Sequence, residues 1–163
     1  SSVIVMIDMN NLVDAKNIMP DIPTAAGTFG GGDGRAVNPY IIEDVLDLQA
    51  MNQNLGANYS LGNDIDASET LSWNGGLGFL PIGNSTNCFT GSLDGQGQKI
   101  TNLFINRGTE NYIGLFGYMN ETGKISNIGL SQYNITGYDY VGGLAGWNNK
   151  TVMNSYGTSS ASS

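Results

Sequence analysis

The sequence predicts an all-β fold: a parallel β-solenoid of about four to five short coils, with one short capping helix near residues 43–55. Three observations lead to this class. Charged residues make up only 12% of the 163 residues while Gly occurs 24 times, which favours turns and short strands over helices. Short apolar runs bounded by Gly or Asn follow from residue 59 onward. A triplet also recurs at nearly constant spacing, which indicates stacked units.

The recurring triplet joins an aliphatic residue to an Asn two positions later. Its copies are Ile100-Thr101-Asn102, Ile125-Ser126-Asn127 and Val152-Met153-Asn154, at intervals of 25 and 27 residues. This period suits one solenoid coil, since a propeller blade needs about 40 residues. We expect the three Asn to align as a corner ladder, because Asn tolerates a left-handed backbone and its amide can bond its copy one coil away. Gly91, Gly117 and Gly146 end the preceding apolar runs and are expected at a second corner, where positive φ or tight packing needs Gly.

Two segments precede the repeats. Residues 1–28 are predicted to be an N-terminal arm or linker with at most one strand, at residues 3–7, because Pro20 and Pro23 interrupt regular structure. Residues 29–163 are predicted to form the solenoid module. Its helix is predicted from apolar residues at helical spacing, acidic residues in the first turn and a following Gly56.

Composition excludes several classes of function. The net charge is −8 and the six basic residues are scattered, so neither nucleic acid nor an anionic membrane surface is an expected partner. The chain has no His, which excludes Ser-His-Asp and Cys-His catalysis and, with a single Cys, a structural zinc site. No apolar run approaches 18 residues, so no membrane insertion is expected. We therefore expect a non-enzyme without catalytic residues or a cofactor.

Acidic residues leave two alternatives open. Asp33, Asp64 and Asp66 lie near Asn and carbonyl groups that suit calcium, although the acidic nonapeptide of calcium-binding solenoids is missing. A sugar-active enzyme would use Asp64 and Asp66, or Asp94. Turn formation explains these residues better, because glycosidases need two convergent carboxylates.

Other side chains suggest surface chemistry. Cys88 is either a buried apolar side chain or a partner in an intermolecular disulfide. Five sequons, in which Asn is followed two residues later by Ser or Thr, are candidates for N-glycosylation at Asn58, Asn84, Asn120, Asn134 and Asn149. Five aromatic residues gather in the repeats, where they either stack on the solenoid or form a platform for glycans: Tyr112, Tyr118, Tyr138, Tyr140 and Trp147.

The repeats resemble a known family. The segments 112–117 (YIGLFG) and 140–146 (YVGGLAG) look like paired GLUG-type repeats, and 89–100 is similar to the coil that precedes them. Residues 38–42, the helix and 59–66 resemble the family's usual entry, so the likeness covers about residues 34–158. The resemblance implies a β-solenoid outside the cell, as in haemagglutinin-like adhesins, cell-envelope proteins and the non-catalytic parts of IgA-protease-type exoproteins. It implies no catalytic residues.

These observations predict a non-enzymatic, extracellular structural protein of the cell surface or envelope. The polar segment after Tyr156 is too small to cover a coil, so we expect an open edge that pairs with other copies or with a larger assembly as an envelope, sheath or filament subunit. The alternative is an adhesin or glycan-binding module of a larger exoprotein.

Overall fold

The computed structural model describes residues 29–149, 151–158 and 161–162, so the predicted arm at 1–28 and its strand at 3–7 lie outside the described residues. The helical elements are α2 (Val45–Ala50), the 3₁₀ turn Met51–Gln53 and the kinked 3₁₀ segment Ser68–Gly76. The strands are β1 (Tyr40–Ile42), β2 (Asn58–Leu61), β3 (Ile65–Asp66), β4 (Ser92–Asp94), β5 (Lys99–Thr101), β6 (Phe104–Asn106), β7 (Phe116–Met119), β8 (Lys124–Ser126), β9 (Gly129–Ser131), β10 (Asn134–Thr136), β11 (Ala145–Asn148), β12 (Thr151–Met153), β13 (Tyr156–Gly157) and β14 (Ala161–Ser162).

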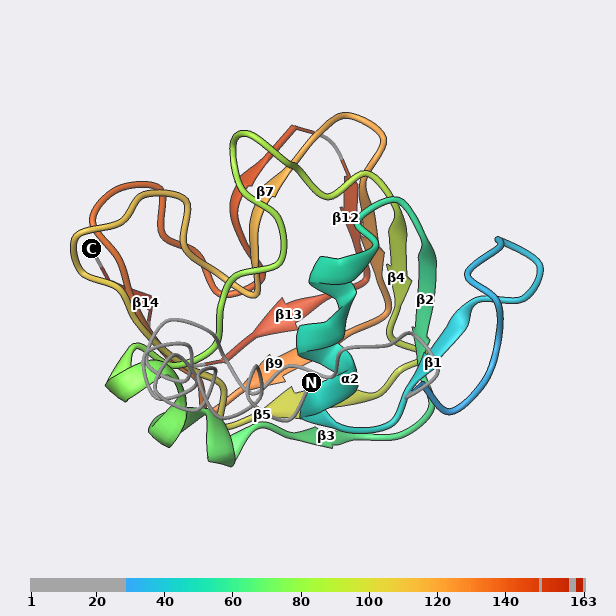
Figure 1. Cartoon of the computed structure of the whole chain (residues 1–163), viewed down its shortest axis with the longest axis horizontal. Coiled ribbons are helices and arrows are strands. Elements are labelled where there is room, and N and C mark those ends of the chain that lie inside the picture. Colours follow the sequence, from blue (N-terminus) through green and yellow to red (C-terminus); the bar gives the residue numbers. More distant parts are fainter. Residues whose placement is uncertain (1–28, 150, 159–160, 163) are drawn as a thin grey trace, which may run out of the picture.

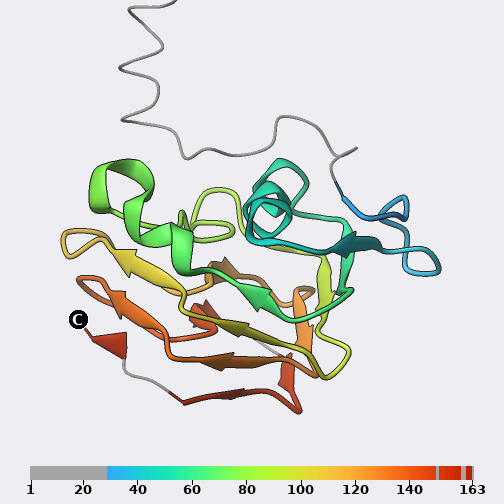
Figure 2. The ribbon, with the colours of Figure 1, turned by 90° about the horizontal axis from the view of Figure 1, so that it is seen from below.

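The strands wind into a parallel β-solenoid, which confirms the predicted fold class. Their sheets have the orders β1-β2-β4-β8-β12, β13-β9-β5-β3, β14-β10-β6 and β11-β7. Figure 2 shows the coils layered on one another, with α2 at one end and the last coil at the other. Asn58, Ser92, Lys124 and Thr151 share one position in successive coils, so a coil takes 34, then 32, then 27 residues. Because the first two of these coils are longer than the predicted period, the chain completes about three turns rather than four to five.

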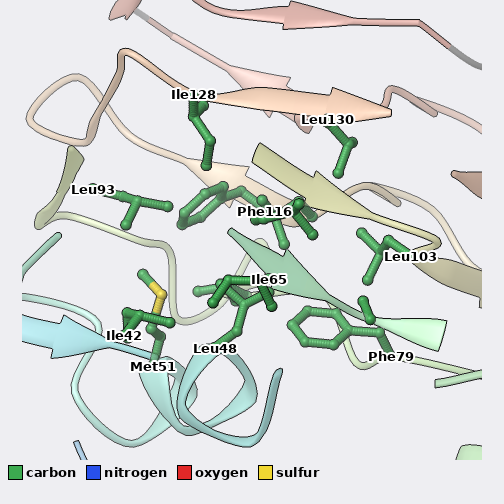
Figure 3. Packing of buried hydrophobic residues seen from close by; sticks show 14 of the residues in the cluster. Ile42, Leu48, Met51, Ile65, Phe79, Leu93, Leu103, Phe116, Ile128 and Leu130 are labelled. Carbon is green, nitrogen blue, oxygen red and sulfur yellow. The ribbon is translucent and has the colours of Figure 1, made fainter. Parts of the chain in front are cut away.

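The core consists of inward side chains stacked in rows. Along one sheet, Ile65, Ile100 and Leu130 lie in register and all three are buried. Leu93 and Ile125 form a similar row in a second sheet. Figure 3 shows such residues from several sheets meeting in the interior. Each full coil therefore buries its apolar side chains against the coils before and after it, and a coil with only one neighbour buries less.

The helix closes the N-terminal end of the solenoid, as predicted, although it is shorter than residues 43–55. Asp44 caps it by accepting a hydrogen bond from the Asp47 backbone N–H at 2.8 Å. Val45, Leu48 and Met51 face the first coil and are buried. Figure 1 shows α2 lying across the coils. Its apolar face thus covers the core on the side of the first coil where the described residues provide no further coil.

The helix and the 3₁₀ turn that follows it also pair part of the backbone edge of the first coil. The side-chain amide of Gln49, which has no exposed surface, donates to the Leu80 carbonyl at 2.8 Å and accepts from the Leu80 N–H at 2.9 Å. Asn52 accepts from the Gly83 N–H at 3.0 Å and donates to the Pro81 carbonyl at 3.2 Å. These two amides take the place of a neighbouring strand along residues 80–83.

The predicted Asn ladder exists in part. Asn127 and Asn154 have φ of 54° and 48°, and Asn154 Nδ2 lies 3.4 Å from Asn127 Oδ1 one coil away. Asn127 Nδ2 in turn donates to Asp94 Oδ1 at 3.1 Å. The placement of Asn102 in this ladder was wrong, since Asn102 follows β5, in a different sheet, and donates to Asp66 Oδ1 at 3.2 Å. Two corners of the coil thus have an Asn with positive φ, and each of these Asn side chains donates to an Asp in the preceding coil.

The Gly residues also need a correction. Gly117 and Gly146 are in register but lie within β7 and β11 rather than at a corner. A Cβ on Gly117 would lie 2.5 Å from the Gly83 carbonyl oxygen, so close packing, not positive φ, requires Gly here. Gly91 belongs to another sheet, immediately before β4, where a Cβ would overlap the Ala57 carbonyl.

Candidate functional site

The C-terminal end of the solenoid collects most of the exposed apolar side chains. Nine large hydrophobic residues are exposed in the described structure, and six of them come from residues 138–156. They are Tyr138, Tyr140, Trp147, Val152, Met153 and Tyr156. Val152 continues the core row of Leu93 and Ile125, yet it is 37% exposed because no described coil covers it. We call this last coil, β11 to β14, the open end.

The core narrows towards the open end. Phe116 is followed in register by Ala145, and Leu130 is followed by Gly157. The smaller residues reduce the apolar area that the last coil presents, but they do not satisfy the backbone hydrogen-bonding groups of its edge strands. Among the described residues, β12 pairs only with β8 and β11 pairs only with β7. The outer sides of β12 and of β11 before Asn148 therefore have no neighbouring strand among the described residues and can pair with another strand.

An aromatic cluster lies beside this end, formed by Tyr112, Tyr118, Tyr140 and Trp147. The rings of Tyr112 and Tyr140 are stacked with centroids 4.8 Å apart and planes 9° apart, and both residues have positive φ, which is uncommon for Tyr. The rings of Tyr118 and Trp147 are nearly parallel, with centroids 5.9 Å apart. Edge contacts link the two pairs. The cluster is thus a stack that follows the coil repeat, and its last members, Tyr140 and Trp147, are 50% and 38% exposed.

The acidic residues singled out in the sequence serve turns and corners. Asp33 pairs with Arg35 at 2.7 Å, and Asp64 accepts from the Lys99 N–H at 2.9 Å. Hydrogen bonds from the Ser68 backbone and the Asn102 amide lower the pKa of Asp66. Asp94 accepts from Gln96 and Asn127. In the described part of the chain, no three Asp, Glu or Cys side chains converge to hold a metal ion.

The surface-chemistry candidates are dispersed. Cys88 is partly exposed and unpaired with another Cys, and its intermolecular disulfide stays a prediction. Asn84, Asn134 and Asn149 are exposed, Asn120 is partly exposed, and the amide of Asn58 is held between Gly34 and Ser92. Tyr138 is exposed outside the aromatic cluster. Sequence reasoning missed Gln49 and Asn52, although polar residues interrupting the apolar face of a short helix were a signal.

The comparisons with known proteins connect this module to much longer chains. No family model matches. The chain is 45% identical over 138 residues to halomucin of Haloquadratum walsbyi, covering 78% of this chain and 2% of halomucin. It is 42% identical over 113 residues to a protein of Evansella cellulosilytica assigned the name Gly-rich membrane protein, covering 68% of this chain and 13% of that protein.

A solved structure shares the fold. It is assigned as an immunoglobulin A1 protease from Bacteroides ovatus, and it matches with a TM-score of 0.59 and 21% identity over 77% of this chain and 36% of that one. At this identity the likeness concerns the solenoid alone. No helix among the described residues is long and apolar enough to cross a bilayer.

Proposed function

We propose that this chain is a non-enzymatic structural module of a cell-surface protein, and that it associates with another chain through its open end. The names of the two relatives, a mucin-like name and a membrane protein, support the surface location. Asp64, Asp66 and Asp94 accept hydrogen bonds that hold turns and corners of the coils, which supports a non-catalytic module.

One observation carries the assembly part of the proposal: the two ends of the solenoid differ. The N-terminal end has its core covered by α2 and residues 80–83 of its backbone edge paired by Gln49 and Asn52. The open end has exposed core residues as well as edge strands that are paired on one side only among the described residues. The open end of a second copy therefore offers the best-matched partner surface, because it combines exposed core residues with edge strands. We propose a two-fold pair, open end against open end, rather than the head-to-tail filament that two open ends would allow.

The test is the concentration dependence of mass, measured by sedimentation velocity with reductant present so that Cys88 cannot link chains. We expect the 163-residue chain to dimerise and Met153→Lys, in β12 at the open end, to be monomeric, because a charged residue on an edge strand opposes pairing. Leu71→Lys is the matched control, since Leu71 is 63% exposed against 53% for Met153 but lies away from the open end and should leave the dimer intact. A wild-type chain that stays monomeric up to high concentration, or a dimer that survives Met153→Lys, would contradict the proposal.

A further inference from the structure

Two of the five sequons repeat a longer motif at equivalent positions of successive coils. The motif is aromatic-x-Asn-x-Thr, seen at 118–122 (YMNET) and at 147–151 (WNNKT). Strands β7 and β11 pair Tyr118 with Trp147 and Met119 with Asn148, so Asn120 and Asn149 follow at the same turn. The second copy includes Lys150, which lies outside the described residues, and the geometry is therefore argued from the first copy.

The first copy has a partly exposed aromatic ring and a partly exposed amide two residues apart. Tyr118 lies in β7 and Asn120 directly follows this strand, and both are partly exposed while the intervening Met119 is buried. Asn120 Oδ1 accepts from the Thr122 N–H at 2.9 Å and lies 2.8 Å from Thr122 Oγ1. These bonds orient the amide, and within the described residues its Nδ2 has no acceptor. The nitrogen that would carry a sugar thus has no acceptor among the described residues, and a partly exposed ring lies two residues before it in the chain.

The other sequons lack this combination. Asn58 Nδ2 donates to the Gly34 carbonyl at 3.0 Å and its Oδ1 accepts from Ser92 at 2.7 Å, so a sugar there would break contacts between coils. Asn84 is exposed, and its Oδ1 closes a turn with Thr86 and Asn87, but the residue two positions before it is the buried Ile82. Asn134 is exposed in β10 and is preceded at that distance by Gln132.

We propose that Asn120 is an N-glycosylation site whose first sugar lies against the Tyr118 ring. The donor is a lipid-phosphate-linked oligosaccharide, transferred by a membrane-bound glycosyltransferase. A bond forms between Asn120 Nδ2 and the anomeric carbon, the bond from that carbon to the phosphate oxygen breaks, and the Nδ2 proton passes to a base of the transferase. The apolar face of the sugar then covers an aromatic surface that water would otherwise contact.

Occupancy is tested by secreting the 163-residue chain from an N-glycosylating host and mapping modified peptides by mass spectrometry. We expect Asn120 to be occupied and Asn58 to be at least tenfold less occupied in the folded fraction. Asn120→Gln should remove the modified peptide. Asn84 is the internal control: an occupied Asn84 with an unmodified Asn120 would overturn the site. So would the absence of any modification when a co-expressed reporter sequon is modified.

The contact with the ring needs a separate readout. Ring currents should shift protons of the first sugar upfield in the NMR spectrum of the folded glycoprotein. We expect this shift to persist in Tyr118→Phe and to disappear in Tyr118→Leu, with backbone resonances of β2 and β4 unchanged as the check that both variants fold. Unshifted sugar protons in the wild-type chain would overturn the role of Tyr118. The proposal does not depend on the open end, because Asn120 is in a coil that is covered on both sides.

Discussion

The two ends of this solenoid solve the same problem differently. At the N-terminal end, Val45 and Leu48 of α2 cover the core and two side-chain amides pair the exposed backbone edge. At the open end, the inner rows shrink to Ala145 and Gly157 while the backbone edge stays unpaired among the described residues. One end has a covered core and a partly paired backbone edge, whereas the other only has a smaller apolar surface. The difference shows that covering a core and terminating a sheet are separate tasks. Smaller inward side chains reduce the apolar surface of the last coil, but they do not pair the backbone groups of its edge strands.

The largest expected effect is the loss of the amide that seals the N-terminal edge. Gln49→Met keeps a side chain of similar size but leaves the Leu80 N–H without its partner and weakens the pairing of the Leu80 carbonyl. Buried backbone groups without partners cost about 1–3 kcal/mol each, so we expect a loss of about 3 kcal/mol. Urea-induced unfolding would measure it.

The matched control for this substitution is Gln98→Met, at a partly exposed position within a turn between β4 and β5. We expect the control to change the free energy of unfolding by less than about 0.5 kcal/mol. Equal losses for the two variants would mean that the amide pairing does not seal the edge, and the contrast between the ends would then rest on apolar burial alone.

One substitution made at both ends sharpens the contrast. Val45 is 3% exposed under the helix, whereas Val152 is 37% exposed at the open end. Val→Ala removes the same two methyl groups at each position, but only Val45→Ala leaves a cavity. We expect a loss of about 2 kcal/mol for Val45→Ala and about 0.5 kcal/mol for Val152→Ala, measured by urea unfolding of dilute protein. If the two variants lost comparable free energies of unfolding at high protein concentration but not in dilute protein, association would be shown to bury Val152.

The smallest expected effect concerns the corner where Asn102 of the second layer contacts Asp66 of the first. Hydrogen bonds from the Ser68 N–H and then from Asn102 lower the pKa of Asp66, so this group contributes stability above its unfolded-state pKa that is lost as pH falls through the folded-state value. Asn102→Gly keeps the positive φ and removes the amide. We expect the pKa of Asp66 to rise part of the way to its ordinary value in an NMR titration. Asp33, whose pKa is lowered by Arg35, is the internal control and should not move.

Composition and repetition were enough to predict the solenoid and its helical cap, because short strands and period follow from local sequence. The alignment of the coils could not be predicted. Asn102 and Asn127 occupy similar triplets but stand at different corners, and both corners need a left-handed residue for the same steric reason. The sealing role of Gln49 was equally hidden, because it depends on Leu80, which is distant in the sequence and approaches only when the first coil closes.

The coil-on-coil register described above also sets where the molecule loosens. Each coil contacts only its neighbours, so opening proceeds most easily by peeling one layer at a time from a free face. With α2 fixed over the first layer, that face is the last one. Amide hydrogens of β12 and β13 should therefore exchange with solvent long before those of β2 and β3, giving a gradient of protection that runs along the axis of the solenoid.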